Sequence, residues 1–403
     1  MKITSIDVIR LTNGHGPVKG NPWFPTVVRV NTDEGIGGIG EIGLAYSSAK
    51  EGGFGVCRDY ADLIIGMDPM ENEVIWEQLY MGTFWAQGGG GFAFGALSAI
   101  DIALWDIRGK ALGVPVYQLL GGKMNKKLRT YASQLQLDWG VPCHRLIQPE
   151  EYGEAALRAK AEGYTAVKVN PMMFGKQGEV FARYTGLLEA DRLKMAVSRV
   201  EAIRRAVGDE MDILLELHGN TDVGSATQVC QALEPYKIFV AEEAVTPMSA
   251  DNLLALSNKT RIPQATGERV YGRWGFRPYF ENQSIRLAQP DLGNCGGITE
   301  GKKIADMAKT YDVGIQAHIC GGPVATAAAL QFEAAISNFV IHEQHAVTRM
   351  PANIALCKYD YQPKDGYYEV PDLPGIGQEL SEEALKVADI VTISKQNSVF
   401  ATR

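Results

Sequence analysis

The feature of this 403-residue chain that most constrains its fold is a long alternation of short apolar segments with helical segments. From about Arg129 onward the apolar runs recur, the later ones roughly every 25 residues, which leaves room for one strand and one helix each. Strands that alternate with helices indicate parallel strands joined by crossover helices. Eight such units predict a closed (β/α) barrel of the TIM type, with a doubly wound open sheet as the competing interpretation. The runs are Thr130–Gln134, Ala166–Asn170, Ile213–His218, Ile238–Glu243, Pro263–Glu268, Arg286–Asp291, Gly314–His318 and Phe339–Glu343.

The residues before this alternation predict a small α+β domain. Apolar residues repeat at three-to-four spacing through Ala93–Leu112, which is typical of a helix. Strand-like runs precede it at Ile3–Leu11, Thr26–Asn31 and Gly35–Leu44. We therefore expect three parts: an α+β domain over 1–125, a barrel over 126–356, and a tail over 357–403 that returns to the first domain.

Composition narrows the class of protein and its surroundings. The chain is 46% hydrophobic, enough for a large core, and its net charge of −8 argues against a nucleic-acid partner. Six scattered cysteines without a CxxC pair indicate reduced thiols. The first residues lack the apolar run of a signal peptide, and no charge-free stretch of about 18 apolar residues is present. A cytoplasmic enzyme without a membrane span is expected.

Carboxylates stand at the C-terminal ends of three successive predicted strands, the edge of a barrel where active sites lie. Glu216, Glu242 and Glu268 are spaced 26 residues apart. Three oxygen ligands in register suit an octahedral Mg²⁺ that keeps positions for water or substrate. The alternative is that these are unrelated surface glutamates at loop starts.

Two histidines at the same edge are candidates for proton transfer. Asp291 and His318 end adjacent strands, and a carboxylate beside an imidazole fixes its tautomer and raises its basicity, as a general base requires. The alternative is a structural hydrogen bond. His218 follows Glu216 by two residues, so strand alternation would place both side chains on one face. We expect His218 to act from the side opposite to His318, unless it is a ligand or merely packed.

Three further polar residues end predicted strands and are candidate substrate contacts. Lys168 would offset the charge of a carboxylate substrate, unless it is a surface lysine, and Asn170 follows it two residues later. Glu343 would donate or accept a hydrogen bond at a substrate oxygen.

Several motifs together resemble the mandelate racemase/muconate lactonizing group of the enolase superfamily, and the resemblance covers nearly the whole chain. Within that group, Glu216-Leu217-His218-Gly219 and His342-Glu343-Gln344 are most similar to galactonate- and mannonate-type acid-sugar dehydratases. The remaining motifs are Ala99–Asp106, Gly109-Lys110, Leu112-Gly113, Pro115, Leu119–Gly122, Ala241-Glu242-Glu243, Ala265–Arg269, Gln289-Pro290-Asp291 and Ala317-His318.

The resemblance implies that residues 1–125 and the tail form a capping domain over a modified barrel that binds one Mg²⁺. Glu216, Glu242 and Glu268 would hold the metal. His318, paired with Asp291, would be the base, and His218 would be the acid. Glu343 would form a hydrogen bond with a carboxylate oxygen of the substrate, and Lys168 would lie near that carboxylate. Specificity would lie in capping loops at Gly14–Pro25 and Tyr46–Gly53, and a symmetric homo-oligomer is expected.

The implied reaction is dehydration of an acid sugar to a 2-keto-3-deoxy acid through an enediolate. The alternatives are an acid-sugar epimerase or racemase with the same site, a non-catalytic relative that binds an acid sugar, and a barrel enzyme that uses Lys168 as a Schiff base. The chain departs from the family pattern at three places, of which Ala244 after Glu243, where Pro is common, is minor. Glu216 stands where Asp is usual, and Asn170 replaces the second lysine of a Lys-x-Lys pair, which disfavours a lysine-based racemase.

Overall fold

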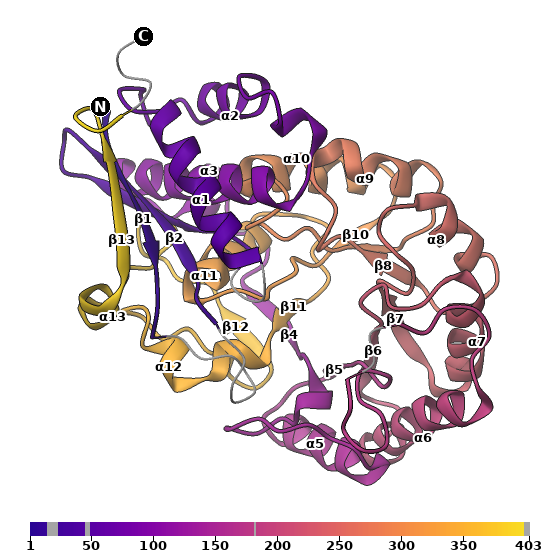
Figure 1. The fold of residues 1–403 in the computed structure, drawn as a ribbon. Coiled ribbons are helices and arrows are strands. Elements are labelled where there is room, and N and C mark those ends of the chain that lie inside the picture. The colour runs from indigo at the N-terminus through magenta and orange to yellow at the C-terminus, as the bar shows by residue number, and fades with distance from the viewer. Residues whose placement is uncertain (14–22, 45–48, 181–182, 399–403) are drawn as a thin grey trace.

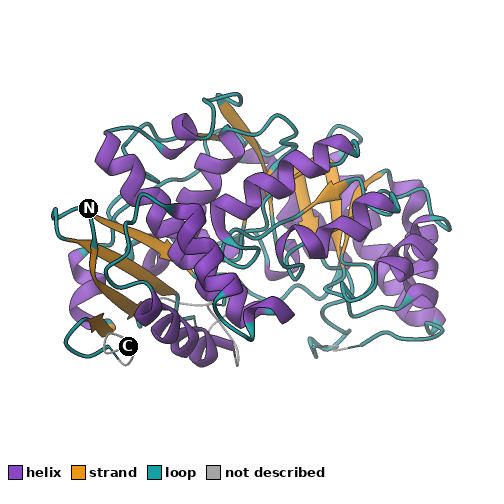
Figure 2. Cartoon of the chain, turned by 90° about the horizontal axis from the view of Figure 1, so that it is seen from above, coloured by secondary structure: helices purple, strands orange, loops and turns teal. Residues whose placement is uncertain are grey.

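Two sheets organise the chain in the computed structural model, which describes residues 1–13, 23–44, 49–180 and 183–398 (Figure 1). The first is antiparallel, with the strand order β13-β1-β2-β3. The second has the order β10-β9-β8-β7-β6-β5-β4-β11, and β12 pairs with β4 beside it. Figure 2 shows the two sheets toward opposite ends of the molecule, with helices between and around them.

The antiparallel sheet and three helices form the first domain. Its strands are β1 (Ile3–Arg10), β2 (Thr26–Thr32), β3 (Gly37–Glu41) and β13 (Asp389–Ser394), and its helices are α1 (Ala49–Leu63), α2 (Asn72–Met81) and α3 (Gly91–Leu112). The last strand, β13, pairs with β1, so the end of the described chain lies in the first domain. Helix α3 packs so closely on β3 that a Cβ atom at Gly40 would lie 2.0 Å from the Ala99 carbonyl oxygen. Only glycine fits there.

The second sheet contains all eight strands that the sequence predicts. They are β4 (Lys127–Ala132), β5 (Ala166–Val169), β6 (Asp212–Glu216), β7 (Ile238–Glu242), β8 (Gln264–Thr266), β9 (Leu287–Ala288), β10 (Gly314–Ile315) and β11 (His342–Gln344). The short helix α4 (Val116–Leu119) precedes them. Between and after them lie α5 (Pro149–Ala161), α6 (Ala190–Val207), α7 (Val223–Leu233), α8 (Ala250–Ser257), α9 (Gly272–Glu281), α10 (Gly297–Thr310), α11 (Pro323–Ala334), α12 (Pro351–Ile354), β12 (Tyr367–Glu369) and α13 (Glu382–Val387).

Several of these strands end earlier than the sequence suggests. Three of the residues that we expected at strand ends, Glu268, Asp291 and His318, follow the last residue of their strand by two or three positions. They therefore stand in the loops at the mouth of the barrel. A loop position leaves a polar side chain free of the alternating geometry of a strand, so each one can be aimed separately.

The sheet closes into a barrel. The Ile315 amide of β10 donates to the Asn338 carbonyl at 2.8 Å, and the Val340 amide donates to the Ile315 carbonyl at 2.9 Å, just before β11 begins. These two bonds join the ends of the sheet, which confirms the barrel over the open sheet. None of the described helices combines the length and apolarity that crossing a bilayer requires.

Side chains of the first domain hold the starts of two barrel helices. The Glu41 carboxylate at the end of β3 accepts hydrogen bonds from the Gly322 amide at 2.6 Å and the Ala325 amide at 3.1 Å, at the start of α11. At the start of α10, Ser98 accepts the Gly296 and Gly297 amides, and Asp101 accepts the Thr299 amide at 2.9 Å. The first amides of a helix have no partner within the helix, so these acceptor oxygens satisfy them and fasten the two domains together.

Candidate active site

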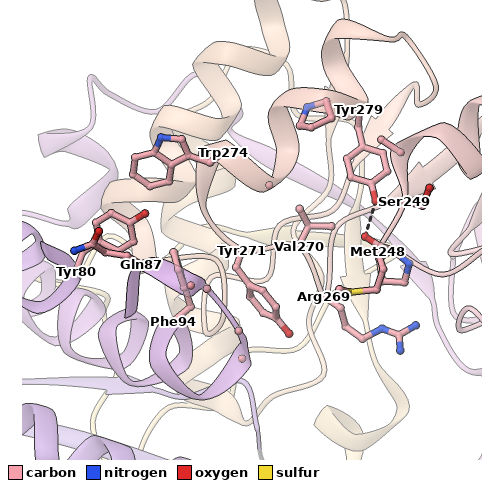
Figure 3. Close-up of a pocket in the computed structure, with 18 of the residues that line it drawn as sticks. Tyr80, Gln87, Phe94, Met248, Ser249, Arg269, Val270, Tyr271, Trp274 and Tyr279 are labelled. Atoms are coloured by element: carbon pink, nitrogen blue, oxygen red, sulfur yellow. Dashed lines mark hydrogen bonds between the residues drawn. The ribbon is translucent and has the colours of Figure 1, made fainter. Parts of the chain in front are cut away.

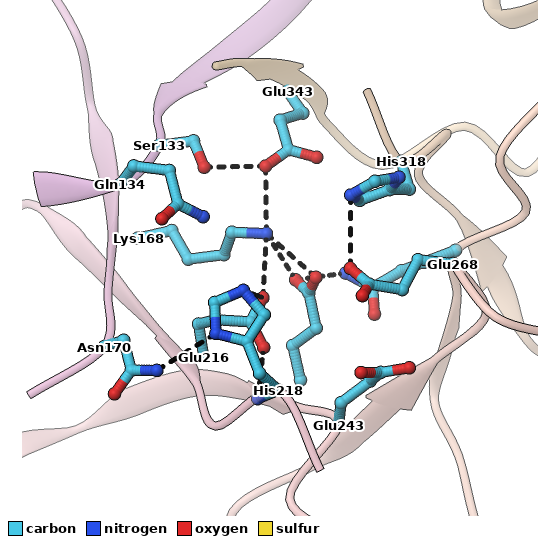
Figure 4. Close-up of polar contacts among 12 residues, drawn as sticks. Ser133, Gln134, Lys168, Asn170, Glu216, His218, Glu243, Glu268, His318 and Glu343 are labelled. Carbon is cyan, nitrogen blue, oxygen red and sulfur yellow. Dashed lines mark hydrogen bonds and ion pairs between the residues drawn. The ribbon is translucent and has the colours of Figure 1, made fainter. Parts of the chain in front are cut away.

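Three carboxylates meet at the mouth of the barrel (Figure 4). Glu216 and Glu242 end β6 and β7 as register partners in the sheet, and Glu268 follows β8 by two residues. One oxygen from each of them lies within 4.8 Å of the others. Gly267, just before Glu268, has a φ of +158° and packs against the Gln289 backbone, where a Cβ atom would lie only 2.4 Å away.

Lys168 is the cation inside this cluster. Its Nζ lies 2.8 and 2.9 Å from the two Glu242 oxygens, 2.9 Å from Glu343 Oε1 and 3.3 Å from Glu216 Oε2. The lysine is only 1% exposed. Burial lowers its pKa, but the neighbouring carboxylates outweigh burial and hold that pKa well above its usual value. The structure thus places Lys168 on the carboxylates, whereas its contact with a substrate stays a prediction.

The carboxylates carry more negative charge than one lysine balances. Burial and the neighbouring Glu242 raise the pKa of Glu216 well above its usual value. The Glu216 Oε2 atom is buried and accepts no hydrogen bond from any described residue, with Lys168 Nζ as its ionic neighbour. Mg²⁺ favours oxygen ligands, and three carboxylate oxygens converge here. One of them, Glu216 Oε2, receives no hydrogen bond within the described part of the chain and is available to a cation. The residues present therefore fit a magnesium ion held by Glu216, Glu242 and Glu268.

His318 lies beside Glu268 and is oriented by Asp291. The His318 Nδ1 atom is 2.7 Å from Asp291 Oδ2, and its Nε2 atom is 3.1 Å from Glu268 Oε2. Asp291 is itself fixed, because its Oδ1 accepts the Gly293 amide at 2.7 Å. Burial lowers the pKa of His318, but Glu268 and Asp291 outweigh burial and raise it to about 10. The predicted imidazole–carboxylate pair is present in the structure.

His218 lies on the Glu216 side of the cluster. Its Nε2 atom is 3.9 Å from Glu216 Oε2, and its Nδ1 atom is 3.1 Å from the side-chain nitrogen of Asn170. Burial lowers the pKa of this imidazole. The strand-alternation argument for its direction was wrong, because β6 ends at Glu216 and His218 adopts a left-handed φ of 50°. The two side chains converge through this turn of the backbone.

Glu343 completes the group from β11. Its Oε1 accepts the Ser133 hydroxyl at 2.6 Å and its Oε2 accepts the Ile319 amide at 3.0 Å. Burial raises the pKa of Glu343, but Lys168 outweighs burial and keeps that pKa well below its usual value. Glu343 is therefore a charged hydrogen-bond acceptor. All nine residues that the sequence singled out as site residues lie at this one mouth.

Sequence reasoning missed two residues that support the site. Arg269 forms an ion pair with the buried Glu243, and its Nη2 donates to the His218 carbonyl at 2.9 Å. Burial and the nearby Glu268 raise the pKa of Glu243 to about 8, although Arg269 opposes this shift. Both residues directly follow a metal-ligand candidate and lie within the family motifs Ala241–Glu243 and Ala265–Arg269, which were the available signals.

A cavity of about 840 Å³ opens beside Arg269, between the first domain and the barrel (Figure 3). Tyr80 and Trp274 stack on one wall, with ring centroids 5.0 Å apart. Of the capping loops expected to set specificity, residues 14–22 and 45–48 lie outside the described residues, and residues 49–53 are not a loop but begin helix α1.

The comparisons with known proteins agree with this geometry. The family model "Enolase C-terminal domain-like" matches residues 151–384, and "Mandelate racemase / muconate lactonizing enzyme, N-terminal domain" matches residues 24–121. A D-galactonate dehydratase of Ralstonia nicotianae is 34% identical over 388 residues, which are 95% of this chain and 93% of the relative. A D-galactonate dehydratase of Pectobacterium atrosepticum is also 34% identical, over 389 residues with the same shares of each chain.

Solved structures extend the likeness to the whole fold. A member of the enolase superfamily from Salmonella Typhimurium is 50% identical, with a TM-score of 0.94 over 97% of this chain and 99% of that one. A mandelate racemase/muconate lactonizing enzyme-like protein from Roseovarius sp. TM1035 is 34% identical, with a TM-score of 0.85 over 96% of this chain and 94% of that one. The chain therefore belongs to the mandelate racemase/muconate lactonizing enzyme family of the enolase superfamily, and its relatives place it among the dehydratases, as the sequence predicted.

Proposed function

We propose that this protein is a magnesium-dependent dehydratase that converts an acid sugar to a 2-keto-3-deoxy acid. The observation that carries the proposal is the placement of two imidazoles toward opposite ends of one carboxylate cluster (Figure 4). Water loss needs one group that takes a proton and another that gives one, at neighbouring carbons. The names of the curated relatives support an acid sugar as the substrate class.

The proposed chemistry assigns one task to each histidine. His318 Nε2 would accept the proton of carbon 2, while Asp291 holds the opposite ring nitrogen. The electrons of the broken C–H bond pass into the substrate carboxylate. They then return to form a C2–C3 double bond as the 3-hydroxyl leaves with a proton from His218. The resulting enol tautomerises to the 2-keto-3-deoxy acid.

Positive charge near the substrate carboxylate is required, because the proton at carbon 2 is only weakly acidic. One Mg²⁺ on Glu216, Glu242 and Glu268 would supply Lewis-acid stabilisation of this negative charge. Lys168 adds a buried ammonium in the same region, and Glu343 offers a fixed acceptor to a protonated oxygen of the substrate.

A Schiff-base mechanism through Lys168 is disfavoured by the geometry. A nucleophilic lysine must lose its proton, which requires a lowered pKa. Lys168 has a raised pKa and lies against three carboxylates.

A symmetric homo-oligomer and a cytoplasmic location stay predictions.

The proposal is tested by offering the protein with Mg²⁺ a library of monoacid and diacid sugars and detecting 2-keto acid. Reactions run in D₂O report exchange at carbon 2 independently of water loss, and His318→Ala serves as the inactive control. Formation of a 2-keto acid from one substrate supports the proposal. Exchange or inversion at carbon 2 without water loss would favour the epimerase. Tight binding of acid sugars with neither reaction would favour the non-catalytic relative.

A further inference from the structure

The orientation of the Asn170 side chain is fixed by a backbone group that can only donate. The side-chain Oδ1 of Asn170 accepts a hydrogen bond from the Met172 backbone amide at 3.0 Å. The backbone amide of Asn170 donates to Gln136 Oε1, also at 3.0 Å. Because the oxygen must face Met172, the amide nitrogen is the atom that faces His218, 3.1 Å from its Nδ1. Asn170 is buried, with 2% exposure.

This contact determines which ring nitrogen of His218 carries the proton. An amide NH₂ group donates and cannot accept, so His218 Nδ1 must be the acceptor. The proton of the neutral imidazole therefore sits on Nε2, the nitrogen that points toward the carboxylate cluster, 3.9 Å from Glu216 Oε2. A neutral His218 thus presents a donor to the site.

The backbone of His218 is held on both sides, so the ring has a fixed origin. Its amide donates to Glu216 Oε1 at 2.7 Å, and its carbonyl accepts Arg269 Nη2 at 2.9 Å. These bonds maintain the left-handed conformation at φ 50°, which a residue other than glycine seldom adopts.

The opposite arrangement holds at His318. The Nδ1 atom of His318 faces the Asp291 carboxylate, which can only accept, so that nitrogen carries the proton. The amide beside His218 therefore places the proton of its neutral ring on Nε2. The neutral form of His318 that acts as the base would keep its proton on Nδ1, and its Nε2 lies 3.1 Å from Glu268 Oε2.

We propose that Asn170 is a positioning residue, which fixes His218 in the tautomer that donates a proton from Nε2 to the departing hydroxyl. This inference rests on the proposed function, because that function assigns the acid step to His218. It replaces a direct substrate contact as the main task of Asn170.

Kinetic measurements distinguish positioning of His218 by Asn170 from direct binding of the substrate by Asn170. Asn170→Ala should lower kcat for water loss about tenfold, the effect expected of one lost hydrogen bond, with KM nearly unchanged. Exchange at carbon 2 in D₂O should persist, because His318 and Asp291 are untouched. In the His218→Ala background, Asn170→Ala should cause no further loss. A rise in KM at constant kcat, or an equal loss in both backgrounds, would assign Asn170 to substrate binding and overturn the proposal.

A structural readout tests the tautomer without turnover. In ¹⁵N-histidine spectra of the whole protein, with the His218 signals assigned through His218→Ala, Nε2 should be protonated and Nδ1 not. Asn170→Asp, which keeps the size but replaces the donor by an acceptor, should protonate Nδ1. A wild-type His218 with its proton on Nδ1 would refute the inference even if the dehydratase is active. Absence of any reaction with every acid sugar, together with the expected spectra, would instead refute the proposed function and leave the tautomer assignment standing.

Discussion

Replacing Lys168 by methionine is the sharpest test of the charge balance at the mouth of the barrel. The substitution keeps an unbranched side chain, one atom shorter, and removes a cation that contacts Glu242, Glu343 and Glu216. All four side chains are buried, so water cannot replace the lost interactions.

The magnitude follows from the cost of leaving a buried charge without its partner. Removing one member of a buried ion pair destabilises a protein by about 3–5 kcal/mol. The loss should not multiply by three, because the raised pKa of Glu216 allows one carboxyl group to take up a proton. We therefore expect Lys168→Met to lower the free energy of unfolding of the metal-free protein by about 3–5 kcal/mol.

Magnesium should recover part of this loss. With Lys168 gone, a divalent cation is the main compensation for the carboxylates. A ligand at 100 times its Kd adds about 2.7 kcal/mol to stability. The stabilisation by a fixed Mg²⁺ concentration should therefore be larger in Lys168→Met than in the wild type, where the ammonium already occupies the cluster.

Urea unfolding of both proteins with EDTA and with Mg²⁺ measures these quantities. Lys237→Met is the matched control, since its exposed ion pair with Asp209 should leave the unfolding midpoint unchanged. A loss below about 1 kcal/mol in EDTA would refute the charge-balance argument. Equal stabilisation of both proteins by Mg²⁺ would refute the assignment of these carboxylates as the metal site.

Three further substitutions test the proposed base, the proposed metal site and the contact between the domains. His318→Ala should abolish proton exchange at carbon 2, measured by NMR in D₂O, while it leaves Mg²⁺ binding in place. Glu242→Ala should weaken Mg²⁺ binding at least tenfold in calorimetry, since it removes one of the three proposed ligands. Burial raises the pKa of Glu41 from 4.5 to about 7, so its contribution to stability is full below pH 4.5 and is lost as the pH rises through 7. The stability of the wild type relative to Glu41→Gln should therefore fall by up to about 3 kcal/mol between about pH 4.5 and 8, and a constant difference in urea unfolding would contradict this.

Much of the fold and of the carboxylate cluster was predictable from the sequence, because both depend on periodicity. Alternation of strands and helices indicates a barrel, and carboxylates placed once per repeat at strand ends must converge. The pairing of His318 with Asp291 follows from the same rule, since their strands β10 and β9 are neighbours.

Contacts between distant loops were not predictable. The direction of His218 depends on a turn held by Arg269, 51 residues further along the chain. The position of Lys168 among three carboxylates depends on how deeply its side chain reaches into the barrel, which no spacing records. The orientation of Asn170 depends on a single bond to Met172. Such details arise only when the loops pack together.

The contacts from Glu41, Ser98 and Asp101 to the starts of α11 and α10 limit how far the two domains can be separated or exchanged. These two helices begin just after the loops that carry His318 and Asp291. A barrel expressed alone would leave both helix starts without their acceptors, next to the residues proposed to perform the chemistry. The two domains are thus not interchangeable modules. A chimera that receives the first domain of a relative would need an acceptor at each of these three positions to keep His318, the proposed base, in place.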